Sequence, residues 1–210
     1  MAKDLNSKCK KCRRVGEKLL LKGERCDSAK CAMVKRNFPP GFHGPKGRQR
    51  STSYGLQLTE KQKARIQYNL MEKQFRLTFE KAQKKSGDAG ENFLQSLEMR
   101  LDNVVYRAGF ASSRSEARQL VSHGHFTIND KNVKIPSFVV RPGDTLKVKT
   151  IKANSKMHKT KLEAIIKKKN IPGWMNFEKD KNSVKVLHKP SMDMINPNFQ
   201  IQQIIEYYSK

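Results

Sequence analysis

Residues 91–148 constrain the fold more than any other stretch, because helix signals there give way to strand signals. Apolar residues at helical spacing predict one helix from about residue 91 to Gly109; they are Leu94, Leu97, Leu101, Val104 and Ala108. A capping box predicts the next helix, with Ser113 as N-cap, Glu116 at N3 and Gly124 as the stop. The alternating segments "HFTIN", "KNVKI", "SFVVR" and "TLKVK" follow, with turns at "NDKN" and "RPGD". This order predicts a small domain with a helix–turn–helix-like pair and an antiparallel sheet.

The sequence on both sides of this domain is predicted to be mainly helical. The pattern "TEKQ" predicts a helix that begins with Thr59 as N-cap and continues to about residue 85. Apolar spacing near the end of the chain predicts a last helix that docks on the earlier helical region. The predicted fold class is therefore α+β, with these divisions: a basic arm with a metal site at 1–58, a helical domain at 59–98 completed by 171–210, an inserted small domain at 99–152, a Lys-rich linker helix at 153–170, and a hairpin and helix at 171–210.

All 4 cysteines lie in one short segment, with the spacing Cys9-x2-Cys12-x13-Cys26-x4-Cys31. Two close pairs separated by a loop are typical of a chain that wraps a tetrahedral ion, and four thiolates suit a structural Zn²⁺. Cations beside the cysteines favour the thiolate form; they are Lys10, Lys11, Arg13, Arg14 and Arg25. A four-iron four-sulfur cluster fits the same ligands, and two disulfides fit the even count, although a reducing compartment argues against them. We therefore expect one zinc ion, with the cluster as the alternative.

The formal net charge is +25, from 44 Lys and Arg against 19 Asp and Glu in 210 residues. Such a chain repels itself unless a polyanion neutralises it, which favours nucleic acid as the partner. The predicted helix after Ser113 places Arg114 and Arg118 four residues apart with Gln119 beside them, a polar face that suits phosphates and sugar edges. His123 and His125 follow at the helix-to-strand corner and are interpreted as structural groups or donors to RNA rather than as metal ligands.

The sequence contains none of the common catalytic patterns, such as a GxxxxGK[ST] loop, a GxSxG elbow or HExxH. We therefore expect no enzyme. No run of 18 apolar residues predicts a membrane span, and the first residues contain no apolar signal segment. A cytoplasmic location and no membrane partner are the expectations.

Residues 100–144, "RLDNVVYRAGFASSRSEARQLVSHGHFTINDKNVKIPSFVVRPGD", resemble the small RNA-binding domain named after ribosomal small-subunit protein four. The flanking sequence resembles the bacterial-type family of that ribosomal protein, in the family's order and over nearly the whole chain. The segments that carry this resemblance are "GERC" and "KC", "PPGFHG", "TSYGLQL", "EKQ", "MEKQFR", "GENFLQSLEMRLDNVVYR" and "EYYSK". The metal-binding form of the family has cysteines where Cys9, Cys12, Cys26 and Cys31 stand.

The resemblance implies a non-catalytic component of the small ribosomal subunit, located in the cytoplasm on the ribosome. It implies early binding to the 5′ domain of the small-subunit ribosomal RNA and nucleation of its assembly. It also implies contact with small-subunit protein five, linked to decoding accuracy, and a basic loop at the messenger RNA entry path, here Lys46, Arg48 and Arg50. Some members repress their own messenger RNA.

We predict RNA contacts at fifteen residues: Arg13, Arg14, Lys46, Arg48, Arg50, Tyr54, Lys61, Arg65, Arg100, Arg107, Arg114, Arg118, Gln119, His123 and His125. Two other functions stay open at this point. One is an RNA-modifying or tRNA-charging enzyme that carries the same small domain, which would need a separate catalytic domain. The other is a metal-finger transcription regulator, which would prefer duplex DNA to junction RNA.

Overall fold

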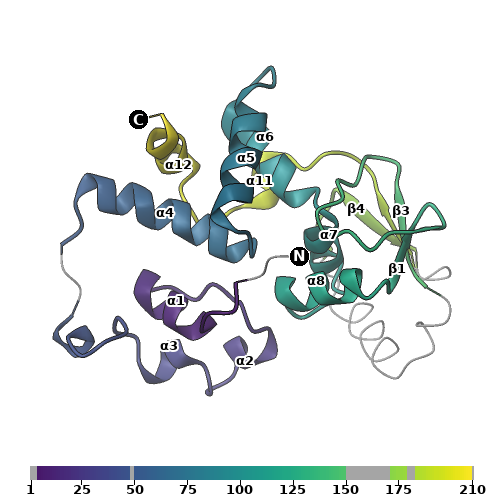
Figure 1. Cartoon of the computed structure of the whole chain (residues 1–210). Coiled ribbons are helices and arrows are strands. Elements are labelled where there is room, and N and C mark those ends of the chain that lie inside the picture. The colour runs from purple at the N-terminus through teal and green to yellow at the C-terminus, as the bar shows by residue number, and fades with distance from the viewer. Residues whose placement is uncertain (1–3, 48–49, 150–170, 179–182, 210) are drawn as a thin grey trace. The chain divides into compact units, whose positions relative to one another are not determined.

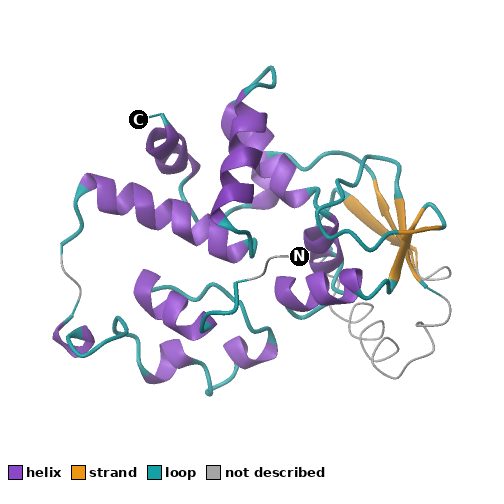
Figure 2. Ribbon diagram, in the orientation of Figure 1, coloured by secondary structure: helices purple, strands orange, loops and turns teal. Residues whose placement is uncertain are grey.

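The computed structural model describes residues 4–47, 50–149, 171–178 and 183–209, and the chain divides into two compact units. The first unit comprises Met1–Ser86 and Pro197–Lys210, and the second comprises Gly87–Asn196. The described part of the first unit is helical, whereas the second combines helices with a sheet (Figure 2). This mixture agrees with the predicted α+β class. Among the described residues, the search for a helix long and apolar enough to span a membrane finds none.

The first unit begins with short helical segments and continues into longer helices (Figure 1). Their bounds are α1 (Lys8–Val15), α2 (Glu24–Asp27), α3 (Ala32–Lys35), the 3-10 turn η1 (Gly44–Lys46), α4 (Ser53–Gln67), α5 (Glu72–Gln83) and α12 (Ile201–Tyr208). Helix α12 packs along α4, as the sequence predicted for the last helix. Tyr208 of α12 stacks on Phe79 of α5, with ring centroids 4.8 Å apart. The end of the chain therefore completes the helical unit.

The helix predicted from Thr59 differs from the observed one at both ends. The N-cap of helix α4 lies seven residues earlier, at Thr52, whose hydroxyl accepts a hydrogen bond from the Gly55 N–H. Thr59 lies inside α4 and donates its hydroxyl to the Gly55 carbonyl, 2.7 Å away. The chain then breaks at Asn69, whose φ of 55° is a left-handed conformation that asparagine tolerates, before α5 begins. The single predicted helix is therefore two helices, α4 and α5, because Thr52 caps an earlier start and Asn69 breaks the chain between them.

The second unit contains the helices α6 (Ala89–Glu98), α7 (Leu101–Arg107), α8 (Arg114–Ser122) and α11 (Met192–Ile195). The sequence predicted α6 and α7 as one helix, and this is wrong. The backbone at Arg100 leaves the helical conformation to form a bridge with Val139. The capping of α8 is confirmed, because the Ser113 hydroxyl accepts a hydrogen bond from the Glu116 N–H, 3.3 Å away.

The second unit also contains one antiparallel sheet in the order β2-β1-β3-β5-β4. Its strands are β1 (Phe126–Ile128), β2 (Lys131–Asn132), β3 (Thr145–Val148), β4 (Met175–Glu178) and β5 (Ser183–Val186). Asn129 and Asp130 join β1 to β2 with positive φ values of 48° and 63°, which a two-residue hairpin turn requires. The predicted strand "SFVVR" contributes only the isolated bridge at Val139.

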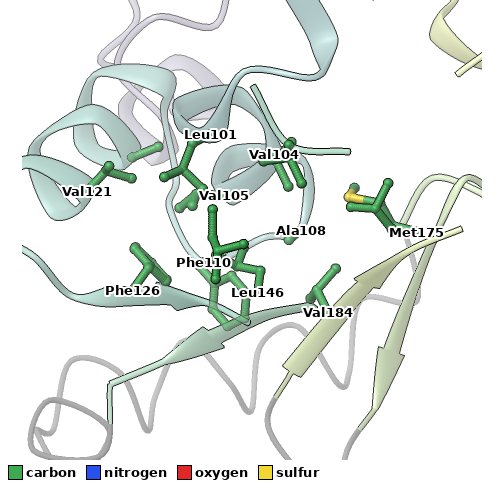
Figure 3. Close-up of a cluster of buried hydrophobic side chains, with 14 of the residues drawn as sticks. Leu101, Val104, Val105, Ala108, Phe110, Val121, Phe126, Leu146, Met175 and Val184 are labelled. Atoms are coloured by element: carbon green, nitrogen blue, oxygen red, sulfur yellow. The ribbon is translucent and has the colours of Figure 1, made fainter. Parts of the chain in front are cut away.

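The core of the second unit lies between the sheet and helices α7 and α8 (Figure 3). Phe110, Leu146 and Val184 have no exposed surface, and Trp174 is 1% exposed. The β4–β5 hairpin therefore belongs to this unit, because Leu146 of β3 pairs with Val184 of β5. The predicted division at 171–210 differs from this arrangement, since only residues 197–210 join the helical unit. Helix α6 likewise joins the second unit, so the predicted boundary at residue 98 lies closer to residue 87.

Two sequence predictions fall outside the described residues. They are the Lys-rich linker helix at 153–170 and the RNA contact at Arg48.

Candidate nucleic-acid interface and cysteine cavity

The four cysteines of the first unit line one small cavity of about 20 Å³. Cys9 and Cys12 lie three residues apart on α1, so both project from the same face of that helix. Cys26 lies on α2, and Cys31 immediately precedes α3. All four thiols are free, with Cys12 and Cys31 buried. The local helices therefore bring both halves of the sequence pattern to one place.

The surroundings of the cavity act on the charge of the sulfur atoms in opposite directions. The Lys22 N–H donates a hydrogen bond to Cys26 Sγ at 3.3 Å, and Lys22 and Arg25 contribute to the cavity lining. Burial raises the pKa of the Cys12 thiol above its ordinary value, a Leu19 N–H lowers it, and the three other cysteines raise it. Four neighbouring thiols can lose their protons together only if a cation compensates their charge.

The predicted metal centre itself is not shown by these side chains. No three Cys, His, Asp or Glu side chains in the described ranges are gathered closely enough to hold an ion. The donor set nevertheless fits a thiolate-binding metal, because four cysteines without disulfide bonds line one cavity. The zinc ion and the alternative cluster therefore both stay predictions.

Arg13 holds the proline-rich segment that follows the cysteines. Its Nε donates to the Phe38 carbonyl at 3.0 Å and its Nη2 donates to the Pro39 carbonyl at 3.2 Å. The guanidinium also lies 4.9 Å from the centroid of the Phe38 ring. Arg13, which was predicted to contact RNA, therefore holds residues 38 and 39 of the arm in place.

Other predicted contacts on the arm are open to solvent. Arg14, Lys46 and Arg50 are exposed. Further exposed cations of the arm were missing from the predicted contacts, although the charge of the segment was the signal for them: Lys10, Lys18, Lys22, Arg25, Lys30, Lys35 and Arg36. The arm therefore presents a broad cationic surface rather than a few selected residues.

Lys61 and Arg65, predicted as RNA contacts on α4, instead pair with Glu72 at the start of α5. Lys61 Nζ lies 2.7 Å from Glu72 Oε1, and Arg65 Nε lies 3.4 Å from Glu72 Oε2. Lys61 is 3% exposed and also faces the Tyr207 ring at 4.9 Å. The predicted contact Tyr54 is 53% exposed and packs beside Tyr207, with 5.8 Å between ring centroids. Burial makes Lys61 a structural cation, whereas Tyr54 keeps an open face.

In the second unit, a buried carboxylate organises two of the predicted contacts. Glu98 is fully buried and accepts hydrogen bonds from Arg107 Nε at 3.0 Å and Nη2 at 2.7 Å. Asn103 donates to the same carboxylate at 2.6 Å and accepts from Arg114 Nε at 2.7 Å. Arg114 also lies over the Tyr106 ring, 4.6 Å from its centroid. Arg107 and Arg114 are therefore oriented by partners inside the unit and are only partly exposed.

A second buried carboxylate, Asp102, lies between two more of the predicted contacts. Arg100 donates to both oxygens of Asp102, at 3.1 and 2.9 Å. Arg118 Nη1 lies 3.9 Å from Asp102 Oδ2, and burial lowers the pKa of its guanidinium despite that carboxylate. Arg100 is 4% exposed and Arg118 is 6% exposed, so the predicted polar face does not present either of them to a ligand. Both arginines are structural in this unit.

The remaining predicted contacts lie at the surface of the second unit. Gln119 and His123 are exposed, and His125 is partly exposed, with 6.3 Å between the two imidazole centroids. The strands and their loops add exposed cations that the sequence prediction did not include, namely Lys131, Lys134, Arg141, Lys185 and Lys189. The alternating pattern of this region predicted its strands, but RNA contacts were predicted only for cations on the neighbouring helix and not for those on the strands and loops.

Two protein-family models together match residues 3–146 of the chain. Residues 3–98 match the model described as "Ribosomal protein S4/S9 N-terminal domain", and residues 99–146 match the model described as "S4 domain". The chain is 48% identical over 210 residues to small ribosomal subunit protein uS4 of Pelotomaculum thermopropionicum and 49% identical over 211 residues to that of Acetivibrio thermocellus. It is 48% identical over 210 residues to the uS4 of Clostridioides difficile. In each case the alignment covers 100% of both chains.

Proposed function

Since the chain belongs to the family of small ribosomal subunit protein uS4, we infer that it is a structural, non-enzymatic component of the small ribosomal subunit that binds ribosomal RNA. The observation that carries this conclusion is the match to uS4 proteins over 100% of both chains. A component of the bacterial small subunit resides in the cytoplasm on the ribosome. The matched family is structural and non-enzymatic, which argues against the alternative of an RNA-modifying or tRNA-charging enzyme.

The finer role rests on the resemblance of the sequence to the family. We propose that the protein binds the 5′ domain of the small-subunit RNA early and promotes its assembly. Its further proposed partners are small-subunit protein five, messenger RNA at the entry path, and its own messenger RNA. The exposed cations Lys46 and Arg50 support a contact with a phosphate backbone, because they are free of the burial that removes Arg100 and Arg118 from the surface.

Binding works by electrostatics and shape in this proposal. The exposed cations of the arm and of the sheet neutralise phosphates and release the counterions that surround RNA. Rigid networks around Glu98 and Asp102 hold α7 and α8 in place, so the surface meets folded RNA without reorganising. Fixing RNA helices at one angle lowers the entropic cost of the next assembly step without any chemistry.

Binding to 5′-domain RNA is expected to weaken steeply as salt rises. If the protein neutralises about six to ten phosphates, the association constant should fall about 10³- to 10⁵-fold between about 50 and 200 mM monovalent salt. Filter binding of the full chain to labelled 5′-domain RNA measures this slope. A duplex DNA of equal charge serves as the control, and a metal-finger transcription regulator would bind it at least as tightly as the RNA. A nearly flat salt dependence on the RNA would contradict electrostatic binding.

We also propose that the cysteine cavity holds one zinc ion as a structural centre. Cys9, Cys12, Cys26 and Cys31 would supply the four ligands, and the ion would cross-link α1, α2 and the start of α3. The lining of one cavity by all four cysteines supports a single centre held by four thiolates. The iron–sulfur cluster is the alternative that metal analysis separates.

A further inference from the structure

Phe42 is an aromatic residue without a place in either core. It lies in the segment between α3 and η1, and its side chain is 91% exposed. Its ring meets His43 edge-on, with centroids 5.3 Å apart and planes at 87°. A phenylalanine in this position leaves its apolar surface in water, so it contributes little to folding. Single exposed apolar residues are common, and exposure alone assigns no role.

The loop that carries Phe42 is built to a fixed shape, and this distinguishes Phe42 from an incidental surface residue. Arg13 anchors the start of the loop through the carbonyls of Phe38 and Pro39. The Gly44 N–H donates to the Gly41 carbonyl at 3.2 Å, which closes a turn directly around Phe42. Any side chain at Gly44 would overlap the Pro39 carbonyl oxygen, so the end of the turn packs directly against the backbone of Pro39. The aromatic ring is therefore displayed by a turn that packing and hydrogen bonds define.

The chemistry around the ring suits one ligand class. Arg36, Lys46 and Arg50 are exposed and lie within eight residues of Phe42 along the chain. Cations in the same segment as an exposed aromatic ring combine attraction for a phosphate backbone with a flat surface on which a base can stack. Unpaired RNA bases are bound in this way, whereas bases inside a helix have no free face.

We propose that Phe42 is a stacking platform for an unpaired RNA base, with the neighbouring cations holding the backbone of the same nucleotide strand. This inference rests on the proposed RNA-binding function and adds a specific contact to it. The base belongs to a single-stranded position of the small-subunit RNA or to a single-stranded messenger, and the chemistry of recognition is the same for both.

The test compares the full chain with Phe42→Leu, Phe42→Tyr and Phe42→Trp on two ligands, the 5′-domain RNA and a single-stranded messenger-like oligonucleotide. Stacking predicts that Phe42→Leu weakens binding to one of them by about tenfold, within the range for losing one stacked base, and that Phe42→Tyr retains binding. The ligand that loses affinity identifies the source of the base. Leu5→Ala is the matched control, because Leu5 is 88% exposed in the same unit, and it should bind like the wild type.

Phe42→Trp gives a direct readout of stacking. The natural Trp174 is the only tryptophan and is 1% exposed, so fluorescence from an exposed indole at position 42 is a separate signal. RNA should quench that signal if a base stacks on the ring. Wild-type affinity of Phe42→Leu for both ligands, or an unquenched indole, would overturn the stacking platform while leaving the proposed function intact. Failure of the wild-type chain itself to bind the 5′-domain RNA would instead overturn the proposed function.

Discussion

Asp102→Ala is expected to lower the free energy of unfolding of the second unit by about 3–5 kcal/mol, the range for breaking a buried ion pair from one side. The substitution would leave two guanidinium groups, Arg100 and Arg118, without their carboxylate in a place where each is at most 6% exposed. Burial already lowers the pKa of Arg118, which shows that its charge is costly there even with Asp102 present. A buried charge that loses its carboxylate partner keeps the cost of its desolvation without the compensating attraction.

Urea unfolding followed by Trp174 fluorescence measures this effect, because the only tryptophan lies in the core of the second unit. The matched control is Asp130→Asn, which removes the exposed ion pair with Lys147 and keeps a residue that tolerates the positive φ of this turn; the Asp130 side chain is 77% exposed. Exposed pairs contribute about 0–1 kcal/mol, so the control should unfold nearly as the wild type does. Equal small losses for both variants would mean that the buried network does not stabilise the unit.

Local signals predicted α8 correctly, although the equally local capping pattern at Thr59 did not mark the start of α4. The Ser113 cap and the Gly124 stop of α8 depend on residues within one turn, and both were placed correctly. The breaks at Asn69 and Arg100 were missed for two different reasons. An asparagine can adopt either a helical or a left-handed conformation, so its presence at position 69 does not predict a break. Arg100 leaves the helix to pair with Val139, which lies 39 positions later in the chain.

The same limit explains the domain boundary. The hairpin at residues 175–186 has clear strand periodicity, but periodicity does not say which sheet a strand joins. Its partner is β3, and the pairing of Lys147 with Ser183 crosses a long intervening segment. Only the register of the folded sheet assigns the hairpin to the second unit.

The candidate contacts divide in a similar way. Exposed cations such as Arg14 and Lys46 follow from charge alone, since a solvated position needs no partner. Arg118 has the same charge and sits at a regular helical spacing, yet it points toward Asp102 of the preceding helix. A helix face that looks polar in sequence can therefore be an interior network, and only the position of the acidic partner distinguishes the two cases.

Removing the proposed zinc ion is expected to unfold residues 8–36 while leaving the second unit intact. The arm has few apolar residues buried around the cavity, so an ion held by four thiolates would supply most of its folding free energy, on the order of 10 kcal/mol in small zinc domains. The purified protein should contain about one zinc per chain, and a chelator should greatly increase trypsin cleavage at the cations of the arm. Cys12→Ser and Cys26→Ser should each reproduce this cleavage without chelator.

Val34→Ala provides the matched control, because Val34 lies in the same segment and is 59% exposed. It should keep its metal and resist trypsin as the wild type does, and Trp174 fluorescence should stay unchanged in every variant. If the purified protein is brown, contains iron and shows the same cleavage pattern, the bound centre is the iron–sulfur cluster, held by the same four cysteines. A metal-free protein whose arm resists trypsin would show that packing alone, through Arg13 and the pair of Lys63 with Glu17, holds the arm together.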